Sequence, residues 1–234
     1  MLGVIHCEPQ VAWQRPFAAK LADGLRAIGI DSRITNSRGR LDEGFPILLG
    51  TTFWRAIETP PYLLVDRCSF GDTNQYVSLV WNGHGKRGDH CVPEGHDASR
   101  WALHGVALMP WRYGERAVLC GQTETYSPTW DHIEDWYASH SEATHFRRHP
   151  AGEVWRLPLA DTFTDAGTVI TLNSSVAIEA LILGRHVTVD DAGGMAYGWS
   201  SREQLMHWLA WTQWHHEEIR TGKPIAHLFD QVAS

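Results

Sequence analysis

A strand–helix–strand pattern in residues 168–191 constrains the fold more than any other feature of the sequence. The segment reads TVITLNSSVAIEALILGRHVTVDD: a β-branched run ends in Asn-Ser-Ser, an apolar helical stretch follows, and a second β-branched run closes it. β-Branched residues favour strands, and an apolar stretch of helical length between two strands connects them. The pattern therefore predicts a parallel sheet with helices on its faces.

The same alternation runs through the first half of the chain. The apolar run 2–7 predicts a strand, and the apolar side chains of residues 16–28 recur at helical spacing. Three later runs, DSRIT, PILLG and YLLVD, predict further strands, and TTFWRAIE between the last two predicts a short helix. Residues 67–108 then become irregular, with one predicted strand at 76–81. Such long irregular stretches are typical of functional loops.

A second β-α series occupies the rest of the chain. It begins with a predicted strand at 116–122, and a helix at 130–140 and a strand at 144–150 follow before the opening pattern. Residues 202–220 predict a long amphipathic helix, which Gly222 and Pro224 end. We therefore expect an α/β protein of two small Rossmann-like halves with parallel sheets, covering residues 1–112 and 113–234.

The composition is that of an ordinary soluble globular protein, with 43% apolar and 20% charged residues. The net charge of -7 opposes binding to a polyanion, so composition offers no argument for nucleic acid. The scattered cysteines Cys7, Cys68, Cys91 and Cys120 lack metal-ligand spacing and predict buried thiols in a reducing cytoplasm. No apolar run reaches about 18 residues, so we expect a cytoplasmic protein without a membrane segment.

Polar residues mark three predicted strand ends in the second half. They are Gln122 at the first end, Arg147 and His149 at the second, and Asn173, Ser174 and Ser175 at the third. Because parallel sheets bind ligands beyond the carboxyl ends of their strands, we expect these residues to converge on one crevice.

Each of these groups suits a nucleotide. The serine pair joins hydroxyls to backbone N–H groups at a helix start, where an anion is favoured. His149, followed by a proline, can donate a hydrogen bond to a phosphate or a nucleobase, and Glu179 can accept from ribose hydroxyls. The alternative for Asn-Ser-Ser is an ordinary helix N-cap.

The order of these motifs resembles the nucleotide-binding half of GT-B glycosyltransferases. His-Pro at a strand end, followed by a serine pair that opens the helix NSSVAIEALILGRHVTV, is similar to bacterial polysialyltransferases and to the Kdo transferases of capsule synthesis. The resemblance implies a GT-B-like fold, with the two motifs holding the nucleotide of a sugar donor and Gln122 near the donor phosphates. The stretches VDRCSFGD, VSLVWNGHGKRG and LMHWLAWTQWHHEEIRTGKPIAHL resemble small phage-encoded proteins of this type.

Two aspartates are candidates for the catalytic base. The resemblance implies that this base comes from the N-terminal half and faces the donor. Asp66 ends the strand YLLVD, and Asp72 follows in a glycine-containing turn. Either carboxylate can take a proton from an acceptor hydroxyl. Asp66 can equally serve as a turn residue or as a partner of Arg67.

The loop that follows strand 76–81 is the predicted acceptor contact. Here a base can stack on an indole while basic side chains take phosphates, as in proteins that hold single strands or flipped bases. The alternatives are contact with a sugar acceptor or a plain hairpin turn. The residues concerned are Trp81, Asn82, His84, Lys86 and Arg87.

These observations predict a glycosyltransferase that uses a nucleotide sugar as co-substrate. The preferred acceptor is a hydroxymethylated pyrimidine, 5-hydroxymethylcytosine or 5-hydroxymethyluracil, in viral DNA. The alternatives are transfer to a surface polysaccharide or other glycan, a nucleotide-sugar 2-epimerase, and an inactive nucleotide-binding module.

No metal or other cofactor is expected. The sequence has no DxD triplet and no HExxH motif. His215 and His216, which precede two glutamates, would point to different faces of a helix, so we interpret them as a solvated helix end.

Overall fold

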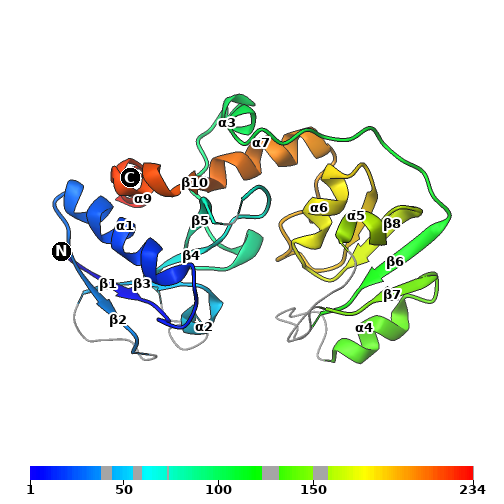
Figure 1. Ribbon diagram of the computed structural model, residues 1–234, viewed down its shortest axis with the longest axis horizontal. Coiled ribbons are helices and arrows are strands. Elements are labelled where there is room, and N and C mark those ends of the chain that lie inside the picture. Colours follow the sequence, from blue (N-terminus) through cyan, green and yellow to red (C-terminus); the bar gives the residue numbers. More distant parts are fainter. Residues whose placement is uncertain (38–43, 55–59, 73, 123–131, 150–157, 234) are drawn as a thin grey trace. The chain divides into compact units, whose positions relative to one another are not determined.

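The computed structural model describes residues 1–37, 44–54, 60–72, 74–122, 132–149 and 158–233. The chain forms two compact units: unit 1 is Met1–His104 with Met206–Ser234, and unit 2 is Gly105–Leu205. The predicted domains, 1–112 and 113–234, differ from these units mainly in the last 29 residues (206 to 234), which belong to unit 1. Each unit contains one sheet (Figure 1).

The sheet of unit 1 has the strand order β10-β5-β4-β3-β1-β2. The four strands at the β2 end are parallel, whereas β5 runs antiparallel to both β4 and β10. Residues 68–75, which join β4 to β5, are too few for a parallel crossover, so the chain must turn back. The strands are β1 (Leu2–His6), β2 (Asp31–Thr35), β3 (Phe45–Leu49), β4 (Leu63–Arg67), β5 (Tyr76–Trp81) and β10 (Gln213–His215).

Helices cover both faces of this sheet. One face packs against α1, α8 and α9 in a large apolar core, and Phe53 of α2 packs on the other face. The predicted helix at 16–28 is confirmed as α1, and Gly29 follows it at φ 77°. The helices of unit 1 are α1 (Gln14–Ala27), α2 (Thr51–Trp54), α3 (Ser99–Leu103), α8 (His216–Arg220) and α9 (Lys223–Ala233), with the 3-10 turn η1 (Gly85–Arg87).

The long helix predicted at 202–220 is wrong. Helix α7 (Arg202–Thr212) ends where Gln213–His215 become extended and pair with β5. His215 then begins α8 with a capping box, in which its N–H donates to Glu218 Oε2 at 2.8 Å. Arg100 also donates to the carbonyl of Gln213 at 2.8 Å. These contacts place the C-terminal residues in unit 1.

Gly24 lets helix α1 lie directly against α8. A Cβ atom at this position would stand 2.0 Å from the carbonyl oxygen of Ile219. We expect Gly24→Ala to lower the free energy of unfolding by at least about 1 kcal/mol, although alanine favours the helix, because the overpacked backbone must shift. Denaturant unfolding measures this, with exposed Asp23→Ala as the control that changes by less than about 0.5 kcal/mol. A Gly24→Ala variant as stable as the parent would contradict the close approach.

The sheet of unit 2 is entirely parallel, in the order β7-β6-β8-β9. The strand–helix–strand pattern of residues 168–191 is confirmed as β8–α6–β9. Side chains alternate between the two faces of the sheet: Val118 and Val169 pack with α6, and Leu119 and Ile170 pack with Trp136. The elements are β6 (Arg116–Cys120), α4 (Ile133–Ser139), β7 (His145–Arg147), α5 (Leu159–Thr162), β8 (Ala166–Thr171), α6 (Val176–Ile182) and β9 (His186–Val189).

The four cysteines are free thiols. Cys7, Cys68 and Cys120 are buried, as predicted, and Cys91 is partly buried. Burial raises the pKa of Cys68 to about 12, which keeps the thiol protonated and unreactive. Within the described part of the chain, no helix has the length and apolar character needed to cross a bilayer.

Candidate functional site

The three polar strand ends of unit 2 lie together at the carboxyl edge of its sheet. Strand β6 lies between β7 and β8, so Gln122 is flanked by the other two ends. Its side-chain amide donates to Asn173 Oδ1 at 2.5 Å, and the N–H of Gly121 donates to the carbonyl of Arg147 at 2.7 Å. We call this group the donor shelf, after the role that the sequence analysis predicts for it; its members are Gln122, Arg147, His149, Asn173, Ser174, Ser175 and Glu179.

Gly121 allows the end of β7 to approach β6. A Cβ atom there would lie 3.0 Å from Phe146 Cζ and 3.3 Å from both the Arg147 carbonyl oxygen and the His149 nitrogen. Such distances are tighter than nearly all real Cβ contacts. A larger residue at position 121 would therefore require the backbone of residues 147–149 to shift. Pro150 lies outside the described residues.

The two serines have different roles. Ser174 Oγ accepts from the N–H of Val176 at 3.3 Å, and the N–H of Ser174 donates to Thr171 Oγ1 at 3.3 Å. Ser175 is the N-cap residue of α6, but its backbone is helical and its side chain makes no capping hydrogen bond. Ser174 thus makes the hydrogen bond expected near a helix start, whereas Ser175 makes no capping bond and is exposed at the surface of the shelf.

The positive charge of Arg147 acts on the pKa values of two other shelf residues, Glu179 and His149. Loss of water around Glu179 raises the pKa of that carboxyl, although part of the side chain is exposed, and the charge of Arg147 opposes the shift. Burial lowers the pKa of His149, and Arg147 lowers it further. The shelf therefore presents a guanidinium beside an imidazole that is neutral at pH 7, an arrangement that suits an anion and a hydrogen-bonding ring.

Two residues that the sequence analysis missed anchor the shelf. Asp191, 1% exposed, accepts from Asn173 Nδ2 at 3.0 Å and from the N–H of Gly193 at 2.7 Å. The Tyr137 hydroxyl donates to the carbonyl of Gln122 and accepts from its N–H, both at 2.8 Å. Asp191 follows β9, so the fourth strand end was the signal that could have revealed it.

Asp66 and Asp72 belong to unit 1 and differ in their surroundings. Asp66 is half-buried at the end of β4, and its Oδ2 lies 3.5 Å from His84 Nε2. Both oxygens of Asp72 accept hydrogen bonds at 2.8 Å, from the N–H of Asn74 and from Gln75 Nε2. These hydrogen bonds hold the pKa of Asp72 below its usual value. Asp72 thus stabilises a turn.

The stacking role predicted for Trp81 is not available to it. The Trp81 side chain is 3% exposed, packs against Phe45 and Phe229, and donates from Nε1 to the carbonyl of Leu228 at 3.3 Å. Trp81 therefore belongs to the apolar core of unit 1, together with Val77 and Leu79 of the same strand.

The loop after Trp81 is a closed turn, as the hairpin alternative states. Trp81 and Asp89 exchange two backbone hydrogen bonds, at 2.7 and 3.0 Å. Asn82 has a positive φ of 50° and accepts from the N–H of Tyr62 at 2.9 Å, so its side chain is structural. His84 is placed beside Asp66; Lys86 is partly exposed and Arg87 is exposed.

The histidine pair near the C-terminus has structural roles. His215 caps α8, and His216 is 7% exposed against the ring of Phe17, so the predicted solvated helix end is wrong for His216. Among the residues that the structure describes, no three His, Cys, Asp or Glu side chains cluster so as to hold a metal ion.

Two solved structures are similar to this chain in fold. One is Thermosulfurimonas dismutans KpsC, a β-Kdo 2,7-transferase, with a TM-score of 0.56, 12% identity, and coverage of 96% of this chain and 99% of that chain. The other is T. dismutans KpsC, a β-Kdo 2,4-transferase, with a TM-score of 0.53, 14% identity, and coverage of 90% and 89%. The chain has a GT-B-like fold. No protein-family model matches the sequence, and no curated protein matches it.

Within this GT-B-like fold, the donor shelf occupies the edge where parallel sheets hold ligands. The two sheets and the two similar structures confirm the predicted fold class. The structure brings the predicted shelf residues of unit 2 together, whereas Asp66, Asp72 and the loop after Trp81 all lie in unit 1.

Proposed function

We propose that this protein is a glycosyltransferase that moves a sugar from a nucleotide-sugar donor to a hydroxyl of a carbohydrate acceptor. The observation that carries the proposal is the meeting of three polar strand ends at one edge of unit 2. The two Kdo transferases that share the fold support the reaction class.

The donor shelf matches the chemistry of a nucleotide. Arg147 and the exposed hydroxyl of Ser175 would meet the negative charge of the phosphate, since charged hydrogen bonds are the strong ones. Glu179 would accept from the ribose hydroxyls, and the neutral His149 would contact the phosphate or the base. Asp191 and Tyr137 hold Gln122 and Asn173 in place beneath the ligand.

Asp66 is the proposed base. It would take the proton of the acceptor hydroxyl as that oxygen bonds to the anomeric carbon. The nucleotide leaves with the electrons of the broken bond, and Arg147 stabilises the charge that develops on its phosphate. Asp66 Oδ1 accepts from the N–H of Arg67 at 2.8 Å, and its Oδ2 faces the His84 ring. Asp66 suits this role better than Asp72, whose oxygens both accept hydrogen bonds at 2.8 Å within a turn.

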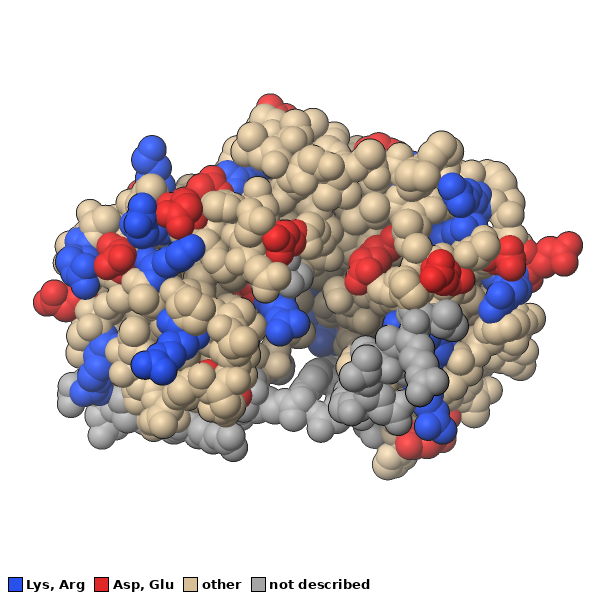
Figure 2. Space-filling view, in the orientation of Figure 1, with Lys and Arg blue, Asp and Glu red and all other residues tan. Residues whose placement is uncertain are grey.

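A carbohydrate acceptor is favoured over DNA. The burial of Trp81 removes the stacking platform on which a DNA base would rest. On the face shown in Figure 2, the described lysines and arginines are interspersed with acidic residues and form no continuous basic track. The net charge of -7 also opposes a polyanion. The acceptor proposed is therefore a polysaccharide or another glycan.

The test is transfer from UDP-, GDP-, TDP- and CMP-activated sugars to a panel of polysaccharides and to hydroxymethylated DNA, with products identified by mass spectrometry. A sugar mass gained only by DNA would overturn the carbohydrate acceptor. Consumption of the donor without any acceptor would indicate a 2-epimerase, and binding without turnover an inactive module. Activity in a chelator tests metal independence, which stays a prediction, as do a cytoplasmic location and a phage origin.

Arg147→Ala is expected to weaken nucleotide binding about 10–100-fold, because one charged hydrogen bond contributes about 1.5–3 kcal/mol. Calorimetric titration with the free nucleotide measures this without an acceptor. The matched control is Arg148→Ala, which removes an exposed arginine next in sequence and should leave the affinity within about twofold. Equal losses in both variants would show that only the general charge of the surface matters.

A further inference from the structure

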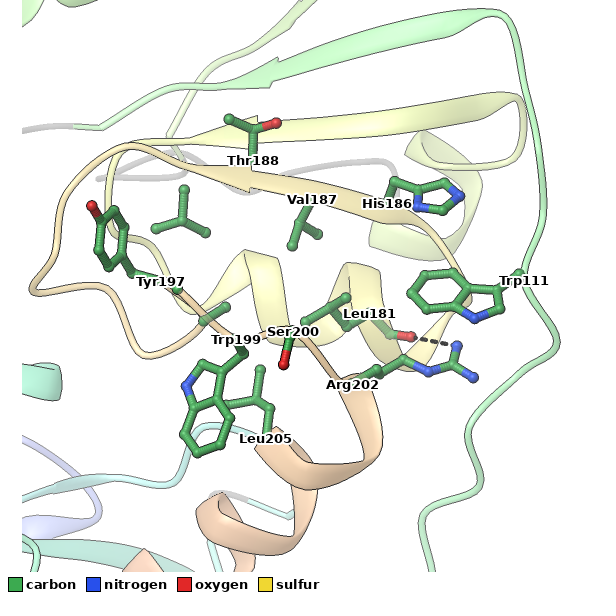
Figure 3. A pocket seen from close by; sticks show the side chains of 13 residues that line it. Trp111, Leu181, His186, Val187, Thr188, Tyr197, Trp199, Ser200, Arg202 and Leu205 are labelled. Carbon is green, nitrogen blue, oxygen red and sulfur yellow. Dashed lines mark hydrogen bonds between the residues drawn. The ribbon is translucent and has the colours of Figure 1, made fainter.

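A cavity of about 620 Å³ lies beside strand β9, within unit 2 (Figure 3). Its base is apolar and consists of Val187 and Val189 of β9, Leu181 of α6 and Leu205 of α7. Leu181 is near the carboxyl end of α6, whereas the serines of the donor shelf precede the amino end of that helix. The cavity is therefore distinct from the shelf, and nothing in the proposed reaction uses it so far.

Stacked side chains fix one end of this cavity. The ring of Trp111 lies parallel to that of His186, with centroids 4.8 Å apart and 6° between planes. The guanidinium of Arg202 lies 4.1 Å from the centroid of the Trp111 ring. Arg202 Nη1 also donates to the carbonyls of Met109 at 2.9 Å and Leu181 at 3.2 Å. Because this wall is already ordered, a ligand would bind at a low entropic cost.

Aromatic side chains also line the opposite end. Figure 3 shows Tyr197 and Trp199 there, on the segment that leads into α7. Trp199 is held by a hydrogen bond from Nε1 to the carbonyl of Met195 at 3.1 Å. Tyr197 is 40% exposed, so part of its ring is open to a ligand, whereas the two faces of Trp111 are covered by His186 and Arg202 (Figure 3).

Apart from the His186 ring, the polar side chains that face the cavity carry hydroxyls. Tyr197 and Ser200 supply them, since Thr188 points to the other side of β9 from Val187 (Figure 3). The cation of the lining, Arg202, is bound by two carbonyls and lies 3.4 Å from Glu203. A phosphorylated ligand would lack a cation of its own here. A lipid chain would cover the Ser200 hydroxyl without forming a hydrogen bond to it, which is unfavourable.

A sugar ring satisfies both kinds of surface, since its C–H face packs on aromatic rings and its hydroxyls exchange hydrogen bonds with the lining. The volume lies within the range of about 300–1,000 Å³ that small-ligand sites occupy. We propose that this cavity binds an uncharged saccharide, and, resting on the proposed function, that this saccharide is part of the acceptor chain. The cavity would then hold the chain at a point away from the hydroxyl that reacts.

The experiment measures saccharide binding without any donor. An array of neutral and acidic oligosaccharides identifies a binder, and calorimetric titration of the full chain measures its affinity. Tyr197→Ala removes one aromatic wall and should weaken binding about tenfold. Ser200→Trp fills the cavity and should abolish binding. The control is Leu103→Ala, which truncates a 67%-exposed apolar side chain of unit 1 outside the cavity and should leave the affinity unchanged. Thermal unfolding shows that each variant is folded.

The proposal is overturned if no oligosaccharide on the array binds, if both cavity variants keep the parental affinity, or if acidic sugars bind and neutral ones do not. Its failure can be told apart from failure of the proposed function. Saccharide binding that depends on Tyr197, without any transfer, leaves the cavity assigned and removes the transferase. Transfer that both cavity variants perform with unchanged KM for the acceptor does the reverse.

Discussion

Asp66→Asn is expected to reduce the turnover number of the proposed transfer reaction by about 10²–10⁴-fold, the usual contribution of a general base. The amide cannot take the proton of the acceptor hydroxyl, whereas it keeps the shape of the carboxylate. The KM for the donor should change little, because the donor shelf belongs to unit 2 and Asp66 to unit 1. Steady-state kinetics with the donor and acceptor found by the product screen measures both quantities.

Asp72→Asn is the matched control for this prediction. One oxygen of the side chain still accepts from the N–H of Asn74, so the turn largely persists. We expect the parental turnover number with a modest loss of stability. A large loss in Asp72→Asn together with normal turnover in Asp66→Asn would exchange the two assignments. A third variant, His84→Gln, shows whether the imidazole ring of His84, whose Nε2 lies 3.5 Å from Asp66 Oδ2, helps to position the Asp66 carboxylate.

Acidification is expected to destabilise unit 1 through its buried and partly buried histidines. Burial lowers the pKa of His216 from 6.5 to about 4, and burial also lowers the pKa values of His6, His90 and His104. These side chains stay neutral in the folded protein, whereas the unfolded chain binds protons below pH 6.5. Their contribution to stability is therefore complete above pH 6.5 and decreases as the pH falls below it; for His216 the decrease continues to about pH 4. For His216 alone this amounts to about 3 kcal/mol.

The measurement is the free energy of unfolding in denaturant at several pH values between 7 and 4.5. His216→Leu, which cannot bind a proton, should show a smaller decrease over this range than the parent. His132→Leu replaces an exposed histidine and should leave the slope as it is. If His216→Leu loses as much stability on acidification as the parent, His216 is not responsible for the effect.

The helices and strands that could be predicted are those whose residues favour one secondary structure by themselves. The β8–α6–β9 unit follows from β-branched runs on either side of an apolar helix, and the two strands and the helix form as predicted. Residues 213–215 show the opposite case. Their helical spacing favours a helix, but the open edge of β5 and the guanidinium of Arg100 favour an extended strand. Tertiary contacts of this kind outweigh helix propensities of less than about 1 kcal/mol per residue.

The candidate site was predictable for a similar reason and to a similar extent. Parallel strands end at one edge, so Gln122 and Asn173 had to be neighbours once the strand order was known. The anchoring of Asn173 by Asp191 depends on how the turn after β9 folds back, which no local pattern states. The burial of Trp81 depends on Phe229, which is far away in the sequence.

The return of the last residues to unit 1 has a consequence for synthesis on the ribosome. Unit 2 is continuous in sequence, but unit 1 is completed only by β10, α8 and α9 at the end of the chain. Until these emerge, β5 has an unpaired edge and the apolar face of α1 lacks its cover. The domain that begins first is therefore finished last. The nascent chain must protect an aggregation-prone edge throughout the synthesis of unit 2.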